Sequence, residues 1–129
     1  TIHKMIKLFA LISCSLFGIW CQQARAQDSA ISRLDSLTFL EQSAQKNALL
    51  IDVRTKTEFK QGHLKGAKQV DFLKPEAFEA YFKKIDTLKP VYLYCRSGNR
   101  SLKAAKYLES VGFKEIYDLR GGYLAVPKK

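Results

Sequence analysis

Apolar runs alternate with amphipathic segments along most of the chain. Runs bounded by turn residues predict four short strands, at residues 48–53, 67–70, 91–94 and 114–119. Apolar residues at helical spacing predict helices that begin near residues 36, 55, 75 and 101, followed by a short helical segment that ends at Pro127. This alternation predicts an α/β fold with a small, mostly parallel sheet flanked by helices on both faces.

Capping residues support two of the predicted helix starts. Asp35 or Ser36 is expected to cap the first helix. Thr55 and Glu58 have the spacing of a capping box, which predicts that the second helix starts there. Residues 27–33 are polar and are interpreted as a loose lead-in to a single domain over residues 34–127, a length that suits one domain.

The first 26 residues have the layout of a secretory signal peptide. A basic start follows Met5, an apolar run covers residues 8–20, and residues 24–26 form a small-x-small cleavage site. Residues 1–4 lie upstream of this start. The apolar run is shorter than the roughly 20 residues of a membrane span. We expect export, to the periplasm, by cleavage before Gln27; the alternative is a lipobox that would place a lipid on Cys14.

Positive charge prevails along the chain, which carries 22 Lys and Arg against 12 Asp and Glu, a formal net charge of +10. Only three of these basic residues precede residue 27, so most of the charge belongs to the predicted domain. Such a balance favours anionic ligands. The lysines are scattered and no stripe of basic and aromatic residues is present, so nucleic acid is not the expected partner.

The strongest chemical signal follows the strand at residues 91–94. The strand stops at Cys95, and small, polar and cationic residues then lead into a helix: Arg96, Ser97, Gly98, Asn99, Arg100 and Ser101. A strand that opens through such a loop into a helix N-terminus predicts an anion site, where inward N–H groups should acidify a thiol. Cleavage before Gln27 would leave Cys95 as the sole cysteine, which excludes an internal disulfide and favours a reactive thiol.

Three further polar residues are candidates for supporting roles. Asp52 ends a buried strand and needs a partner, for which Arg54 and the loop arginines are available. Asp52 then either orients the cysteine loop or forms a structural ion pair. His63 either serves Cys95 as a general base or, in the more ordinary interpretation, clips the turn by a hydrogen bond. No cluster has metal-ligand spacing, and no phosphate or dinucleotide loop motif is present.

Three motifs in order make the chain resemble the rhodanese-like (thiosulfate sulfurtransferase) family. Residues 50–54 with Glu58-Phe59 and 62–67 resemble the first signature, residues 91–101 the active loop, and residues 119–123 the closing Leu-x-Gly-Gly motif. Val126 departs from the family, in which tryptophan is common near this position. The resemblance implies a single-domain sulfurtransferase without a metal or organic cofactor. Cys95 would take a sulfane sulfur from a small anionic donor, with thiosulfate favoured by charge, and carry it as a persulfide to cyanide or a thiol.

In this reading, the loop N–H groups would hold the persulfide, and Arg96 and Arg100 would attract the donor. A partner protein could accept the sulfur or reduce the persulfide. Two alternatives remain open from the sequence. A phosphatase or arsenate reductase would use a Cys-x5-Arg loop, whereas Cys95 and Arg100 are one residue closer. A binding module would carry sulfur to a partner, or sense redox state, without turnover.

Overall fold

The computed structural model describes residues 28–128. The predicted signal peptide, with Cys14 and Cys21, lies outside these residues. No helix within the described range is long and apolar enough to cross a membrane.

Five parallel strands form one sheet, in the order β1-β5-β4-β2-β3. Their bounds are Ile31–Leu34 (β1), Leu49–Asp52 (β2), Lys68–Gln69 (β3), Val91–Tyr94 (β4) and Ile116–Leu119 (β5). The central strand β4 is buried along its whole length. It lies between β2 and β5, so the residue that follows it emerges at the carboxyl edge of the sheet, where open α/β folds place their ligands.

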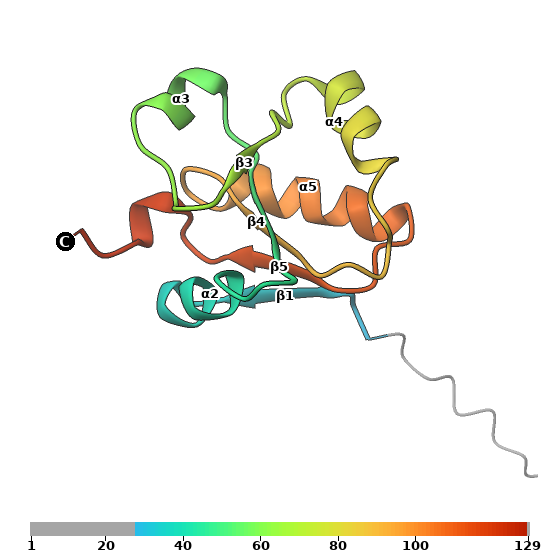
Figure 1. The fold of residues 1–129 in the computed structure, drawn as a ribbon, viewed down its shortest axis with the longest axis horizontal. Coiled ribbons are helices and arrows are strands. Elements are labelled where there is room, and N and C mark those ends of the chain that lie inside the picture. Colours follow the sequence, from blue (N-terminus) through green and yellow to red (C-terminus); the bar gives the residue numbers. More distant parts are fainter. Residues whose placement is uncertain (1–27, 129) are drawn as a thin grey trace, which may run out of the picture.

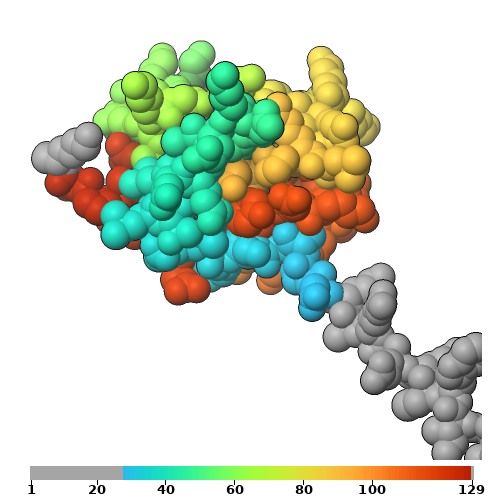
Figure 2. Space-filling model, turned by 60° about the horizontal axis from the view of Figure 1, so that its bottom comes forward, coloured from blue at the N-terminus to red at the C-terminus, as the bar shows by residue number. Residues whose placement is uncertain are grey.

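Helices cover both faces of the sheet, as predicted (Figure 1). Their bounds are Ser36–Ser43 (α2), Lys56–Lys60 (α3), Pro75–Phe82 (α4) and Asn99–Ser110 (α5), and a 3-10 turn, η1, spans Tyr123–Ala125. Phe39 of α2 is buried with Leu50 and Tyr92 on one face, and Figure 2 shows α2 lying across that face. On the other face, Phe78 of α4 and Leu108 of α5 join the second core cluster.

The predicted caps are present. Asp35 accepts a hydrogen bond from the Thr38 backbone N–H at 3.0 Å and caps α2. Thr55 and Glu58 form the reciprocal capping box of α3. Helix α5 begins at Asn99, two residues earlier than predicted, so Arg100 and Ser101 lie in its first turn.

The interpretation of residues 27–33 as a loose lead-in is wrong for residues 31–33, which belong to β1. This strand pairs with β5 along its length, from Ile31 opposite Ile116 to Leu34 opposite Leu119. Only its two end residues are apolar and its middle is exposed, as suits an edge strand. Because so short a segment gives no apolar run, its strand character is set by β5 rather than by its own pattern.

Candidate active site

Cys95 lies at the bottom of the loop between β4 and α5. Its side chain is only 1% exposed, while Arg96 and Ser97 beside it are exposed. Gly98, with φ of 99°, precedes the first residue of α5 and donates its backbone N–H to Cys95 Sγ at 3.1 Å. A Cβ at Gly98 would lie 3.1 Å from Arg33 Nη2 and 3.3 Å from the Gly121 nitrogen. The left-handed backbone conformation therefore favours glycine at this turn, and an added Cβ would also press against Arg33 and the Gly121 nitrogen.

The loop acidifies the thiol. Burial raises the pKa of Cys95. Hydrogen bonding by the Ser101 hydroxyl and by the peptide N–H groups of Ser101, Gly98 and Ser97 lowers it by more, so the pKa falls below its ordinary value. These N–H groups lie at the start of α5, where the helix dipole also favours negative charge. The predicted anion loop is therefore a cradle of N–H donors around one sulfur atom.

Hydrogen bonds from η1 hold this loop in place. Tyr123 N–H donates to the Cys95 carbonyl at 2.8 Å, and Leu124 N–H donates to the Arg96 carbonyl at 3.1 Å. A Cβ at Gly122 would lie 2.5 Å from the Arg96 carbonyl carbon and oxygen. The second glycine of the Gly121-Gly122 pair thus lets two backbone segments touch where no side chain fits.

The two loop arginines have different environments. Arg100 donates from both terminal nitrogens to Glu58 of α3, at 2.8 and 2.7 Å. The hydrogen bond from Arg100 is the largest cause that lowers the pKa of Glu58 to about 2. Arg96 is exposed and forms none of the ion pairs found among residues 28–128. The sequence predicts Glu58 only as a capping residue, because its second role depends on packing between α3 and α5.

Asp52 and Arg54 form a buried ion pair, one of the two interpretations that the sequence leaves open. Arg54 Nε lies 2.9 and 3.0 Å from the two Asp52 carboxylate oxygens, and Arg54 Nη2 lies 2.7 Å from Oδ2. The same Nη2 donates to the Gly62 carbonyl at 2.7 Å, and the guanidinium carbon lies 4.5 Å from the Tyr123 ring centroid. The pair connects β2 to the turn after α3 and to η1.

His63 takes the position of a turn residue. Its Nδ1 lies 2.9 Å from the Phe59 carbonyl oxygen, and its ring stacks on Phe59 with centroids 3.7 Å apart. The side chain is exposed, and none of its hydrogen bonds within the described range reaches Cys95. The structure therefore groups His63 with the turn and not with the nucleophile.

Two residues that are not among the sequence-based candidates lie behind the loop. Asp118 of β5 is wholly buried, and its Oδ2 accepts from Arg33 Nε of β1 at 2.9 Å. Arg33 Nη2 also reaches the Gly98 carbonyl at 3.5 Å. An acid inside a buried strand is a recognisable signal, and Asp118 needs a partner for the same reason as Asp52.

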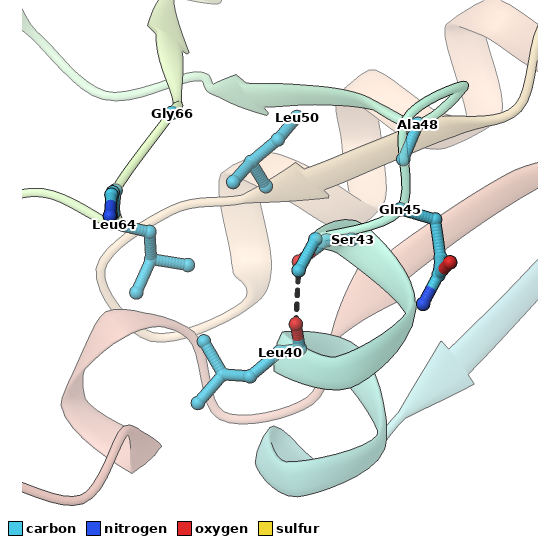
Figure 3. Close-up of a pocket in the computed structure, with 9 residues that line it drawn as sticks. Leu40, Ser43, Gln45, Ala48, Leu50, Leu64 and Gly66 are labelled. Carbon is cyan, nitrogen blue, oxygen red and sulfur yellow. Dashed lines mark hydrogen bonds between the residues drawn. The ribbon is translucent and has the colours of Figure 1, made fainter.

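Apart from this loop, a pocket opens between α2 and the segment before β3. Leu40, Leu50 and Leu64 line it, and Figure 3 shows these side chains pointing into it. It contains none of the predicted site residues. Among residues 28–128, no group of three or more His, Cys, Asp and Glu side chains is placed to hold a metal ion.

The fold and the site define a class of protein: a parallel α/β domain with one acidified cysteine in an N–H-lined loop between a central strand and a helix. The chain belongs to the rhodanese-like family, since the model of the rhodanese-like domain matches residues 36–129. A crystal structure of a rhodanese-like domain protein from Staphylococcus aureus superposes with a TM-score of 0.65 at 23% identity, covering 76% of this chain and 93% of that one.

Curated relatives show the same likeness in sequence. The uncharacterized protein YqhL of Bacillus subtilis is 45% identical over 80 residues, 60% of this chain and 60% of the relative. The thiosulfate sulfurtransferase GlpE of Pseudomonas fluorescens is 35% identical over 79 residues, which cover 61% of this chain and 70% of the relative. A tRNA uridine(34) hydroxylase of Pelagibacter ubique is 35% identical over 79 residues that make up only 26% of its length.

Proposed function

We propose that the protein is a sulfurtransferase that moves a sulfane sulfur from a small anionic donor, thiosulfate, to a thiophilic acceptor through a persulfide on Cys95. The observation that carries the proposal is the geometry of the loop: Cys95 is buried where β4 leads into α5, and the Gly98 N–H donates to its Sγ at 3.1 Å. Likeness to relatives named thiosulfate sulfurtransferase supports this class of reaction.

The proposed reaction has two displacement steps. The Cys95 thiolate attacks the outer sulfur of thiosulfate, a new S–S bond forms, and the electron pair of the old S–S bond leaves with sulfite. An acceptor such as cyanide or a thiol, free or on a partner protein, then attacks the outer persulfide sulfur, and the Cys95 thiolate leaves. Charge balances in each step, so neither step needs an outside oxidant, metal or organic cofactor.

The loop residues have distinct roles in this scheme. The N–H groups of Ser97, Gly98 and Ser101 stabilise negative charge on the thiolate and then on the persulfide. Arg96, exposed and without an ion pair in the described part of the chain, attracts the donor. Arg100 acts differently from the expectation drawn from sequence, because Glu58 already binds its guanidinium on two nitrogens. We assign it the task of holding α5 in place.

The same contact argues against an oxyanion phosphatase. Such an enzyme needs a free arginine that wraps around a tetrahedral anion, and Arg100 is both one residue closer to Cys95 and bound to Glu58. A sulfur carrier without turnover uses the same persulfide. The match to a short part of a tRNA uridine(34) hydroxylase favours it as the second candidate.

Turnover separates these candidates. The full chain, with Cys14→Ser and Cys21→Ser so that Cys95 is the only thiol, is mixed with thiosulfate and cyanide, and thiocyanate and sulfite are measured. We expect both products in equal amounts, and neither product from the variant that also carries Cys95→Ser. A persulfide that forms but is not discharged by cyanide or small thiols would support the carrier. Hydrolysis of a chromogenic phosphate ester would contradict both.

We further propose that the protein works after export, on the strength of the signal-like pattern before Gln27. Cell fractionation with mass spectrometry of the mature N-terminus tests this. A mature chain that begins at Gln27 outside the cytoplasm is expected. Retention of residues 5–26 in the cytoplasm, or a fatty acid on Cys14, would contradict simple cleavage.

A further inference from the structure

Two buried polar groups behind Cys95 are left without partners. Ser101 of α5 and Asp118 of β5 are both wholly buried. Within residues 28–128, Ser101 Oγ and Asp118 Oδ1 are the only buried side-chain nitrogen or oxygen atoms without a hydrogen bond. Buried polar atoms are nearly always paired, so two unpaired atoms behind one nucleophile require an explanation.

The Ser101 hydroxyl acts on the pKa of both neighbours without being committed to either by a hydrogen bond. It lowers the pKa of the Cys95 thiol, against the burial that raises it, and in the same way it lowers the pKa of Asp118, which burial raises above its ordinary value. A hydroxyl carries one hydrogen and can donate it to one acceptor at a time. The thiolate of Cys95 and the free oxygen of Asp118 therefore compete for one hydrogen bond from this hydroxyl.

The charged side chains nearby, Arg33 and Arg100, are bound to other acceptors and do not hydrogen-bond the free Asp118 oxygen. Arg33 of β1 binds only Asp118 Oδ2, at 2.9 Å, and its other contact is the Gly98 carbonyl. Arg100 of α5 is bound to Glu58 of α3, and this hydrogen bond is the main cause that raises its pKa, while Cys95 and Asp71 raise it less. Among the described residues, Ser101 is the one side chain that lowers the pKa of both Cys95 and Asp118.

We propose that Asp118 is a positioning residue that sets the acidity of Cys95 by drawing the Ser101 hydroxyl away from the sulfur. When Asp118 is ionised, its Oδ1 accepts a hydrogen bond from the Ser101 hydroxyl and the thiolate loses one of its donors. A thiolate becomes a poorer nucleophile as the pKa of its thiol falls, and the best attacking thiol has a pKa near the ambient pH. Asp118 thus counteracts the loop N–H groups and preserves nucleophilicity. This inference rests on the role of Cys95 in the proposed function.

The test is a titration of Cys95 by its thiolate absorbance, in the full chain with Cys14→Ser and Cys21→Ser. Asp118→Asn keeps the shape, offers an N–H to Ser101 Oγ and frees the hydroxyl for the sulfur. We expect its titration midpoint to fall by about one pH unit. In a Ser101→Ala background, Asp118→Asn should shift the midpoint much less. An unchanged midpoint in Asp118→Asn, or an undiminished shift without Ser101, would overturn the proposal.

Arg33→Met supplies a second variant if Asp118→Asn does not fold. It breaks the same ion pair but leaves an uncompensated carboxylate, so the midpoint should rise, opposite to Asp118→Asn. A purely structural role predicts the same direction for both, and a midpoint that falls or stays fixed in Arg33→Met would contradict ours. The titration uses no sulfur donor. Failure of sulfur transfer with the expected shifts would therefore count against the proposed function and not against this device.

Discussion

Two buried aspartates flank the cysteine strand, one on each neighbouring strand, and they are treated differently by the fold. Asp52 of β2 and Asp118 of β5 are both wholly buried, and their strands pair with β4 on either side. Both carboxylate oxygens of Asp52 are bound by Arg54, whose side chain is 5% exposed. Asp118 has one oxygen bound by Arg33, whose side chain is 38% exposed, and one oxygen free.

The two aspartates therefore have different roles, one in stability and one in the chemistry of Cys95. A fully paired buried carboxylate has no spare hydrogen-bonding capacity and can only hold elements together, here β2, the turn after α3 and η1. A half-paired one retains an acceptor that can respond to its neighbour, here Ser101 and, through it, Cys95. The carboxylate most easily noticed in the sequence is the structural one.

The largest expected effect compares the two aspartates directly. Asp52→Asn leaves the Arg54 guanidinium buried without a carboxylate, and we expect a loss of about 3–5 kcal/mol in the free energy of unfolding. Asp118→Asn also leaves an arginine, Arg33, without its carboxylate, but water reaches this side chain. We therefore expect a loss of about 1 kcal/mol in the free energy of unfolding. Denaturant unfolding of both variants measures the two costs, and equal losses would break the comparison.

Next in size is the support that the β5 side gives the loop. The Cβ of Gly122→Ala would collide with the Arg96 carbonyl and displace the loop, and we expect sulfur-transfer kcat/KM to fall about a hundredfold. Gly66→Ala is the matched control: Gly66 also has a positive φ, of +82°, but no atom lies within 4 Å of the place that an added methyl group would take. Similar activity losses in the two variants would show that general strain, and not the loop contact, is responsible.

A smaller effect is the opposite pH dependence of the stability contributed by Glu58 of α3 and by Asp118 of β5. The pKa of Glu58 is depressed from 4.5 to about 2, so its stabilising contribution is complete above pH 4.5 and is lost as the pH falls towards 2. Glu58→Gln should therefore flatten the acid loss of stability. The pKa of Asp118 is raised, so its contribution is present in acid and lost as the pH rises.

Unfolding free energies measured between pH 2 and 7, on the order of a dozen points at fixed ionic strength, test these signs. Asp118→Asn should steepen the acid loss of stability, opposite to Glu58→Gln. A profile that shifts in the same direction for both variants would contradict the assigned environments.

The smallest effect concerns the exposed arginine. Arg96→Ala should raise KM for thiosulfate by a factor of about three at low salt, with kcat unchanged, because an exposed charge steers the anion without touching the reacting bond. Added salt should erase most of the difference. Lys46→Ala is the control: Lys46 precedes β2, at the amino edge of the sheet, whereas Cys95 follows β4 at the carboxyl edge. An equal change in KM for Lys46→Ala would point to net charge alone.

Much of this molecule could be predicted from sequence, because the strongest signals are local. The four predicted strands and the Thr55 capping box need only neighbouring residues to be recognised. The missed features depend on pairing between distant segments. Strand β1 is defined by β5, and Arg100 reaches Glu58 across 42 positions. Asp118 gains its character from Arg33, 85 positions away, and no local pattern reports such contacts.

The most direct test of the account is the intact mass of the full chain, with Cys95 as its only thiol, before and after incubation with thiosulfate. We predict the gain of one sulfur atom, its loss on addition of cyanide, and no gain in the Cys95→Ser variant. A mass that does not change while Cys95 remains a free thiol would contradict the proposed transfer of sulfur from thiosulfate.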